Sequence, residues 1–179
     1  MFAAGAPREW GWHSLTDEWA ARIVADAEIR PHDLVLDVGA GRGALTRHLL
    51  AAGARVIAVE LHPQRIAYLR SRFADTTVTI VGADASNLVL PRRPFRVVAS
   101  PPYALTSVLL RALLAPRSQL TRADLVLQRA AVRRCVEGGV AGSRGWSGRW
   151  TLTAGRSLPR AAFHPPPRVD SAVLTVRRR

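Results

Sequence analysis

The feature that most constrains the fold is an alternation of short apolar runs with segments of helical spacing. Five runs rich in valine, leucine and isoleucine are nearly continuous, which is typical of strands buried on both faces of a parallel sheet. In the four segments between them, apolar residues recur at helical spacing. Strands that alternate with helices predict a doubly wound α/β fold. The predicted strands are 33–40, 55–61, 77–83, 95–103 and 124–128, and the predicted helices are 43–52, 63–73, 104–115 and 129–137.

Three further elements flank this alternating core. Residues 16–29 predict an amphipathic helix before the first strand, with Thr16 or Ser14 as its N-cap. The segments 151–163 and 171–178 predict two last strands around the turn-rich sequence HPPPRVD. We therefore expect a Rossmann-like, mostly parallel seven-stranded sheet with an antiparallel last strand.

Composition limits the class of protein. A chain of 179 residues with 48% apolar residues can form one domain with a packed core. It has no apolar run of the roughly 18–20 residues that a membrane span needs, and its N-terminus lacks a signal-peptide pattern. The single cysteine, Cys135, fits a reducing compartment, and the five histidines are too scattered for a zinc site. We expect a cytoplasmic monomer with no membrane partner and no metal.

Positive charge is concentrated in the second half of the chain. Residues 1–90 contain nine arginines and ten acidic residues, whereas residues 91–179 contain seventeen arginines and three acidic residues. A coding bias toward G+C explains the absence of lysine but not this asymmetry. The first half is therefore expected to bind a small molecule and the second half a polyanion, and arginine suits RNA.

A glycine-rich turn, DVGAGRG at 37–43, follows the first predicted strand. Gly39 and Gly41 allow a tight turn and let a ligand approach the backbone closely. The glycine spacing alone fits a dinucleotide as well as other nucleotide cofactors.

Three carboxylates at the ends of predicted strands favour S-adenosylmethionine over a dinucleotide. Asp37 would lie near the methionine ammonium, and Glu60 would accept hydrogen bonds from the ribose hydroxyls, as in other doubly wound nucleotide sites. Asp84 would accept from the adenine amino group. The alternative role for each is that of a carboxylate in a surface loop.

A second motif, Ser100-Pro-Pro-Tyr103, follows the fourth predicted strand. Proline donates no backbone hydrogen bond and restricts the residue before it, so this turn is stiff and leaves carbonyl groups free. If the turn lies beside the methyl donor, the Ser100 hydroxyl and the Pro101 carbonyl can accept from an exocyclic amine and make its nitrogen more nucleophilic. Tyr103 would then stack on an extruded base. The alternative is an ordinary loop.

These motifs, together with FHPPPRVDSAV near the C-terminus, resemble the Erm family of rRNA adenine-N6 methyltransferases, which is related to the KsgA-type enzymes. The resemblance covers roughly residues 10–176 and implies S-adenosylmethionine as cofactor. It implies 23S rRNA or a large-subunit precursor as partner, methylation at the macrolide-binding region, and macrolide-type resistance. The alternatives are a KsgA-type small-subunit dimethyltransferase, a DNA amine methyltransferase and a non-catalytic RNA-binding relative.

The resemblance also implies roles for single residues. In the family, an aromatic residue packs on the target adenine, and it corresponds to Phe163 in this sequence. Phe163 and Tyr103 would then hold the base between them. The alternative role of Phe163 is that of a hydrophobic plug at the edge of the sheet. GWHSLTD resembles the family motif GQNFLxD, so His13 and Leu15 are expected to close over the methionine part of the cofactor. Ser100 stands where the family usually has asparagine, and N4-cytosine methyltransferases also use serine there.

The family's C-terminal helical domain has no counterpart in this sequence, so we expect one catalytic domain over 1–179. It would comprise a cap at 1–30, a flexible loop at 138–150 and a basic tail at 177–179. RNA binding then falls to the catalytic domain, where arginines interleaved with tryptophans suit stacking and phosphate contact. The candidate RNA-binding residues are Arg133, Arg134, Arg144, Trp146 and Arg149.

Overall fold

A computed structural model describes residues 13–138, 146 and 148–179. The strands are β1 (Ser14–Leu15), β2 (Leu34–Val38), β3 (Arg55–Glu60), β4 (Thr79–Gly82), β5 (Phe95–Ala99), β6 (Leu120–Gln128), β7 (Trp150–Leu158), β8 (Phe163–His164) and β9 (Ser171–Arg178). The α-helices are α1 (Asp17–Asp26), α2 (Ala44–Ala51), α3 (Pro63–Arg72), α4 (Thr106–Leu113) and α5 (Arg129–Val136). Short 3₁₀ turns are η1 (Ala85–Asn87), η2 (Tyr103–Leu105) and η4 (Arg160–Ala162).

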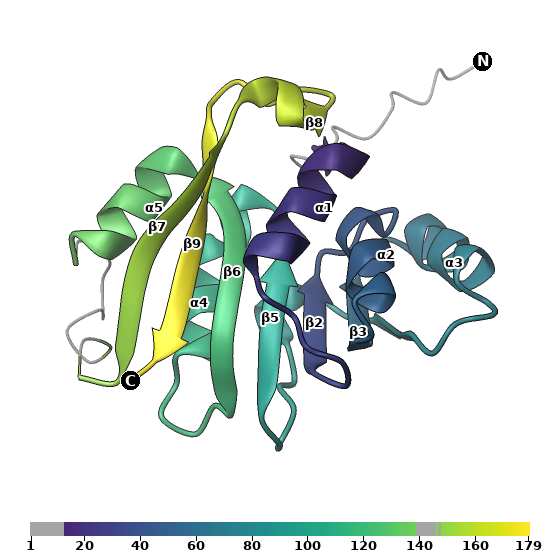
Figure 1. Ribbon diagram of the computed structural model, residues 1–179, viewed down its shortest axis with the longest axis horizontal. Coiled ribbons are helices and arrows are strands. Elements are labelled where there is room, and N and C mark those ends of the chain that lie inside the picture. Colours follow the sequence, from purple (N-terminus) through teal and green to yellow (C-terminus); the bar gives the residue numbers. More distant parts are fainter. Residues whose placement is uncertain (1–12, 139–145, 147) are drawn as a thin grey trace, which may run out of the picture.

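Seven strands form one sheet in the order β4-β3-β2-β5-β6-β9-β7, and β1 pairs with β8 in a separate two-stranded sheet. The five strands from β4 to β6 run parallel, whereas β9 runs antiparallel to both of its neighbours (Figure 1). The mostly parallel sheet with an antiparallel last strand, predicted from the sequence, is confirmed.

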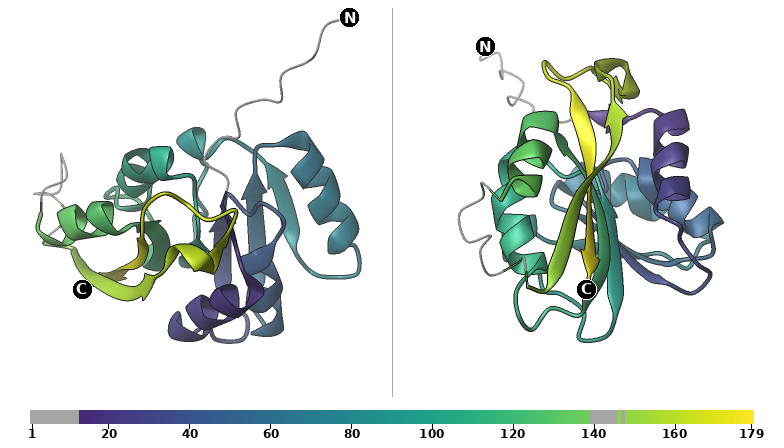
Figure 2. Two further views of the ribbon diagram at one scale, coloured as in Figure 1. Left: turned by 90° about the horizontal axis from the view of Figure 1, so that it is seen from above. Right: turned by 60° about the vertical axis from the view of Figure 1, so that its left-hand side comes forward.

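The period of two along β2 explains the layers of the fold, because successive strand residues point to opposite faces. Leu34, Leu36 and Val38 belong to a core cluster with apolar residues of α4 and α5. Val35 belongs to another cluster, with apolar residues of α1 and α2. Figure 2 shows these helix pairs on opposite faces of the sheet. No helix in the described part of the chain is long and apolar enough to cross a membrane.

The parallel strands all end at one edge of the sheet, called here the carboxyl edge. In doubly wound folds, ligands bind in the crevice outside this edge. The antiparallel strands meet it too, because Ser171, the first residue of β9, lies opposite Gln128 of β6 and Leu158 of β7. The connection from β7 to β9 carries β8, which pairs with β1 above the sheet (Figure 1).

Candidate functional site

The glycine-rich turn after β2 lies against the proline turn after β5. Gly39, Gly41 and Gly43 all have positive φ, at 78°, 60° and 80°, which glycine adopts without steric cost. A Cβ atom on Gly39 would lie 3.3 Å from Cδ of Pro102 and 3.4 Å from Cα of Pro101. The two motifs that the sequence analysis assigned to cofactor and target therefore meet at the carboxyl edge.

Glu60 at the end of β3 is held by backbone donors. Its Oε2 accepts from the Gly41 N–H at 2.8 Å, and its Oε1 accepts from the N–H groups of Leu61 and His62, each at 2.9 Å. A carboxylate offers about four acceptor positions, so these three donors leave one position, on Oε2. Glu60 is therefore held beside the glycine turn with one acceptor position left.

Asp37 is enclosed beneath the glycine turn. It is 1% exposed, and its Oδ2 accepts from the Thr46 hydroxyl of α2 at 2.7 Å. Burial raises the pKa of Asp37 to about 7; the Thr46 hydrogen bonds lower it, and the charge of Glu60 raises it further. The sequence analysis placed this carboxylate near the methionine ammonium. The structure turns it toward α2, where it supports the turn from below.

Asp84 lies after β4 as the N-cap of η1. Its Oδ1 accepts from the Ser86 N–H at 2.8 Å, and this hydrogen bond lowers the pKa of the exposed carboxyl group. The Ser86 side chain also lowers this pKa, so one neighbouring residue holds the ionised and exposed carboxylate.

Tyr103 follows the prolines, and its ring is fixed through its hydroxyl. The Tyr103 hydroxyl lies 2.7 Å from Oγ of Ser171, which is fully buried at the start of β9. Burial raises the pKa of this half-buried phenol, so it stays neutral at physiological pH. Within the described ranges, neither the Ser100 hydroxyl nor the Pro101 carbonyl makes a hydrogen bond. Both oxygens thus remain free to accept from a substrate amine.

His13 is the ring next to Tyr103. The two rings are stacked, with centroids 6.3 Å apart and planes 28° apart. His13 Nδ1 donates to the carbonyl of Pro165 at 2.8 Å. The connection between β7 and β9 therefore anchors both rings, through Pro165 and, at its end, Ser171. The sequence analysis assigned His13 to the cofactor and missed this pairing, because it depends on contacts between distant segments.

Phe163 does not face the proposed base site. It is 3% exposed and lies in the core cluster of α1 and α2, opposite Leu15 in the β1–β8 pair. The predicted sandwich with Tyr103 is wrong in this conformation, because β1 covers the ring and removes it from solvent. Phe163 instead takes the alternative role of a plug at the edge of the sheet, and Leu15, 7% exposed, packs with it.

Of the expected arginine and tryptophan RNA surface, Trp146 is corrected, whereas the exposed Arg133, Arg134 and Arg149 stay predictions. Trp146 is 8% exposed and packs in the core cluster of α4 and α5, so it offers no face to RNA. Arg149 donates from Nη1 to the Pro116 carbonyl at 2.8 Å. Arg133 and Arg134 are exposed on α5, and Arg144 lies outside the described residues.

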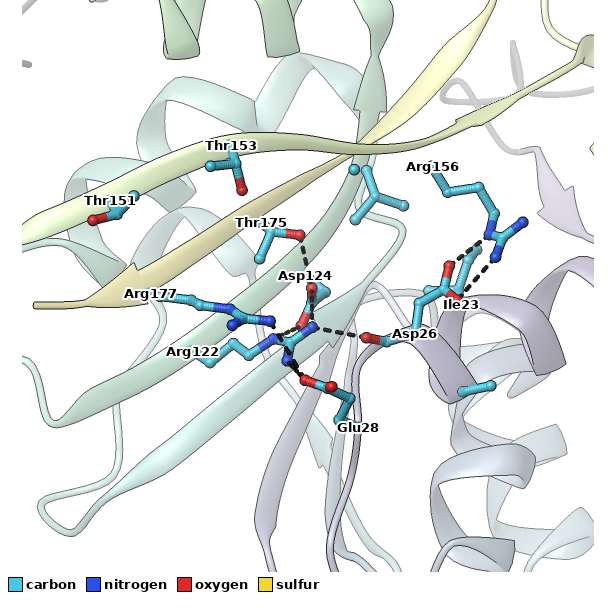
Figure 3. Close-up of a pocket in the computed structure, with 13 residues that line it drawn as sticks. Ile23, Asp26, Glu28, Arg122, Asp124, Thr151, Thr153, Arg156, Thr175 and Arg177 are labelled. Atoms are coloured by element: carbon cyan, nitrogen blue, oxygen red, sulfur yellow. Dashed lines mark hydrogen bonds and ion pairs between the residues drawn. The ribbon is translucent and has the colours of Figure 1, made fainter.

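A pocket of about 720 Å³ lies away from the carboxyl edge, between the end of α1 and strands β6, β7 and β9 (Figure 3). Its three arginines already face three carboxylates. Arg122 donates to Glu28 at 2.7 Å and to Asp124 at 2.8 Å, and Arg156 donates to Asp26 at 2.5 Å. Because these charges are paired, we assign the pocket to fixing α1 against the sheet rather than to ligand binding.

Comparison with known proteins identifies the family. Residues 8–179 match the family model described as ribosomal RNA adenine dimethylase. The mycinamicin-resistance protein MyrB of Micromonospora griseorubida is 35% identical over 182 residues, which cover 99% of this chain and 57% of MyrB. The ribosomal RNA small subunit methyltransferase A of Thermosynechococcus vestitus is 36% identical, over 96% of this chain and 69% of that protein.

Solved structures agree with this assignment. The 23S rRNA methyltransferase ErmE superimposes with a TM-score of 0.83 at 29% identity, over 93% of this chain and 70% of that chain. A dimethyladenosine transferase from Plasmodium falciparum superimposes with a TM-score of 0.81 at 25% identity, over 93% of this chain and 64% of that chain. The fold and the family resemblance expected from the sequence are thereby confirmed. The chain belongs to the ribosomal RNA adenine dimethylase family.

Proposed function

We propose that this protein transfers a methyl group from S-adenosylmethionine to N6 of an adenine in 23S rRNA, at the macrolide-binding region. One observation carries the proposal: the glycine turn touches Pro101 and Pro102, so donor and acceptor sites adjoin. The likeness to a mycinamicin-resistance protein and to a 23S rRNA methyltransferase supports the large subunit and macrolide-type resistance. Because small-subunit methyltransferases match at similar identity, small-subunit rRNA is the second candidate. The chain spans 57% of the length of MyrB.

The cofactor site would use the backbone of the glycine turn and two carboxylates. Glu60 would accept from a ribose hydroxyl through its remaining Oε2 position, and Asp84 would accept from the adenine amino group through Oδ2. Asp37 would hold the turn in place through Thr46. S-adenosylmethionine, when bound, supplies a methyl group on a positively charged sulfur.

The acceptor site would use oxygens and aromatic faces. The Ser100 hydroxyl and the Pro101 carbonyl would accept the two amine hydrogens and favour a more nucleophilic nitrogen. Tyr103 would stack on one face of the extruded base, and we assign the other face to His13 in place of Phe163. The two ring centroids are 6.3 Å apart and their planes are inclined by 28°, so the rings would have to separate and become more parallel to take a flat base between them. The proton would leave to water after transfer.

The proposal is tested by S-adenosylmethionine binding, measured by calorimetry, together with transfer of labelled methyl to rRNA. Tyr103→Ala should retain cofactor binding and lose turnover, by about fivefold to a hundredfold if stacking contributes about 1–3 kcal/mol. The control is Tyr68→Phe, which keeps the exposed ring on which Arg42 lies and should keep turnover. Cofactor binding without any methyl transfer by the wild type would favour a non-catalytic RNA-binding protein. Unchanged turnover in Tyr103→Ala would remove Tyr103 from the site.

A further inference from the structure

Three arginines surround a surface pocket of about 360 Å³ at the carboxyl edge. The pocket is distinct from the glycine turn, and the expected RNA-binding residues do not line it. Its lining residues come from the start of α5, from η4 and from the connection that precedes β9. They are Arg129, Ala130, Arg160, Arg168, Val169 and Asp170.

The strand register explains why these residues meet. Ser171 lies opposite both Gln128, the last residue of β6, and Leu158, the last residue of β7. The ends of β6 and β7 and the start of β9 therefore lie side by side at the carboxyl edge. Arg129 directly follows β6 and Arg160 follows β7 by two residues, which brings two cations to the same place.

The charge of the pocket is only partly compensated. Arg129 pairs with Asp170 at 3.3 Å. Arg160 and Arg168 are exposed, and neither has a carboxylate within ion-pair distance in the part of the chain that the structure describes. This leaves a formal charge of about +2 around a concave surface, in contrast to the paired charges of the pocket in Figure 3.

The pocket adjoins the proposed base site through two consecutive residues. Asp170 lines the pocket, and Ser171 holds the Tyr103 hydroxyl at 2.7 Å. A nucleotide whose base stacks on Tyr103 would therefore bring a neighbouring backbone phosphate toward the arginines. Guanidinium groups bind phosphate oxygens in pairs, which makes arginine well suited to hold such a phosphate.

We infer that this pocket binds an RNA backbone phosphate next to the target nucleotide, through Arg160 and Arg168. The inference rests on the proposed function, because it takes the position of the base from Tyr103. The pocket would position the RNA strand along the protein surface, because phosphate contacts fix where the backbone lies. Ser100 and Pro101 would instead act on the base itself.

The test compares two double variants of equal charge. Arg160→Gln with Arg168→Gln removes both unpaired cations of the pocket. The control, Arg55→Gln with Arg117→Gln, removes two exposed arginines at the opposite edge of the sheet, where β3 begins and just before β6. Binding of a transcript of the macrolide region of 23S rRNA is measured from about 50 to 250 mM salt, since each phosphate contact contributes about 0.7–0.9 to the log–log slope.

The pocket variant should have a salt slope shallower than that of the wild type by about 0.7–0.9, the contribution of one phosphate, whereas the control should keep the wild-type slope. Its KM for RNA should rise while turnover at saturating RNA and S-adenosylmethionine affinity stay within about twofold. If the wild type methylates the transcript and the pocket variant keeps its slope, or both double variants change equally, the pocket assignment fails and the proposed function stands. If the wild type neither binds nor methylates rRNA, both fail.

Discussion

At the scale of single residues, the site depends on rings whose positions are set from elsewhere in the chain. His13 precedes β1 and Tyr103 follows β5, yet His13 is hydrogen-bonded to Pro165 just after β8, and Tyr103 to Ser171 at the start of β9. Residues such as Pro165 and Ser171 contribute by fixing the planes and the spacing of the rings. A base can stack between two rings only if their separation is close to what it needs before it arrives.

Replacement of His13 tests this spacing. His13→Ala removes one face of the proposed slot and should lower turnover by about fivefold to a hundredfold, the range that corresponds to 1–3 kcal/mol of stacking. His13→Phe keeps an aromatic face and should retain most of the turnover. S-adenosylmethionine affinity, measured by calorimetry, should be similar in both variants. A large loss of cofactor affinity in His13→Ala would instead return His13 to the cofactor site predicted from the sequence.

Asp37 predicts a specific dependence of stability on pH. Its pKa in the folded protein is raised to about 7, above its ordinary value of 3.8, mainly by burial. Between these pH values the folded state holds a proton that the unfolded state lacks, so this residue makes stability fall as pH rises from about 4 to 7. The full loss is of order 4 kcal/mol, at about 1.4 kcal/mol for each unit of pKa shift.

Asp37→Asn should remove this dependence while keeping an acceptor for Thr46. Urea unfolding from about pH 5 to pH 8 should show the variant gaining stability relative to the wild type as pH rises, by a few kcal/mol in all. Gln64→Ala, at an exposed uncharged side chain of α3, is the control and should differ from the wild type by a constant amount. A constant difference for Asp37→Asn as well would contradict the raised pKa.

At the scale of elements, local patterns predicted the parallel core well, because each strand there is a short apolar run. The predicted strand 95–103 ends early, at Ala99, since the prolines that follow cannot continue a ladder. The strand predicted at 124–128 begins earlier in the structure, at Leu120. The apolar pattern did not predict this start, because the charged Arg122 interrupts it. In the structure Arg122 is accommodated in the strand by pairing with Asp124 and Glu28.

The candidate site was predictable where its motifs are local. The glycine turn, Glu60 and the proline turn each lie at the end of one strand, so their order along the chain already placed them. The burial of Phe163 depends on the pairing of β8 with β1, and the burial of Trp146 depends on α4 and α5. Such long-range packing leaves no local signal, and the glycine and arginine neighbours of Trp146 suggested a surface loop.

The start of α2 provides a test of packing at this scale. Gly43 has φ of 80°, and a Cβ atom there would lie 2.5 Å from the Phe73 ring. Gly138 has a similar φ of 76°, but a Cβ atom would meet no atom of the described residues within 4 Å. Gly138→Ala should therefore cost only the strain of the left-handed backbone, about 1 kcal/mol, whereas Gly43→Ala should cost about 1–3 kcal/mol more from overpacking. Equal losses in urea unfolding would show that Phe73 moves aside freely.

At the scale of the whole molecule, the two halves of the chain contribute different parts of the proposed site, in line with their different charges. The near-neutral first half forms the glycine turn and the carboxylates at the ends of β3 and β4. The basic second half forms the proline turn and the arginine pocket. The doubly wound topology brings both halves to the carboxyl edge, where the glycine turn with its carboxylates lies near the arginine pocket. The proposed cofactor and RNA sites would therefore adjoin there.

The measurement that tests this account most directly is methyl transfer to purified, unmodified 23S and 16S rRNA, with each product mapped by mass spectrometry of nuclease fragments. The account predicts N6-methyladenine confined to the macrolide-binding region of 23S rRNA, and its loss in Tyr103→Ala. Label only in 16S rRNA would assign the protein to the small subunit instead. N4-methylcytosine, or S-adenosylmethionine binding with no methylated product, would contradict the roles given to Ser100 and Tyr103.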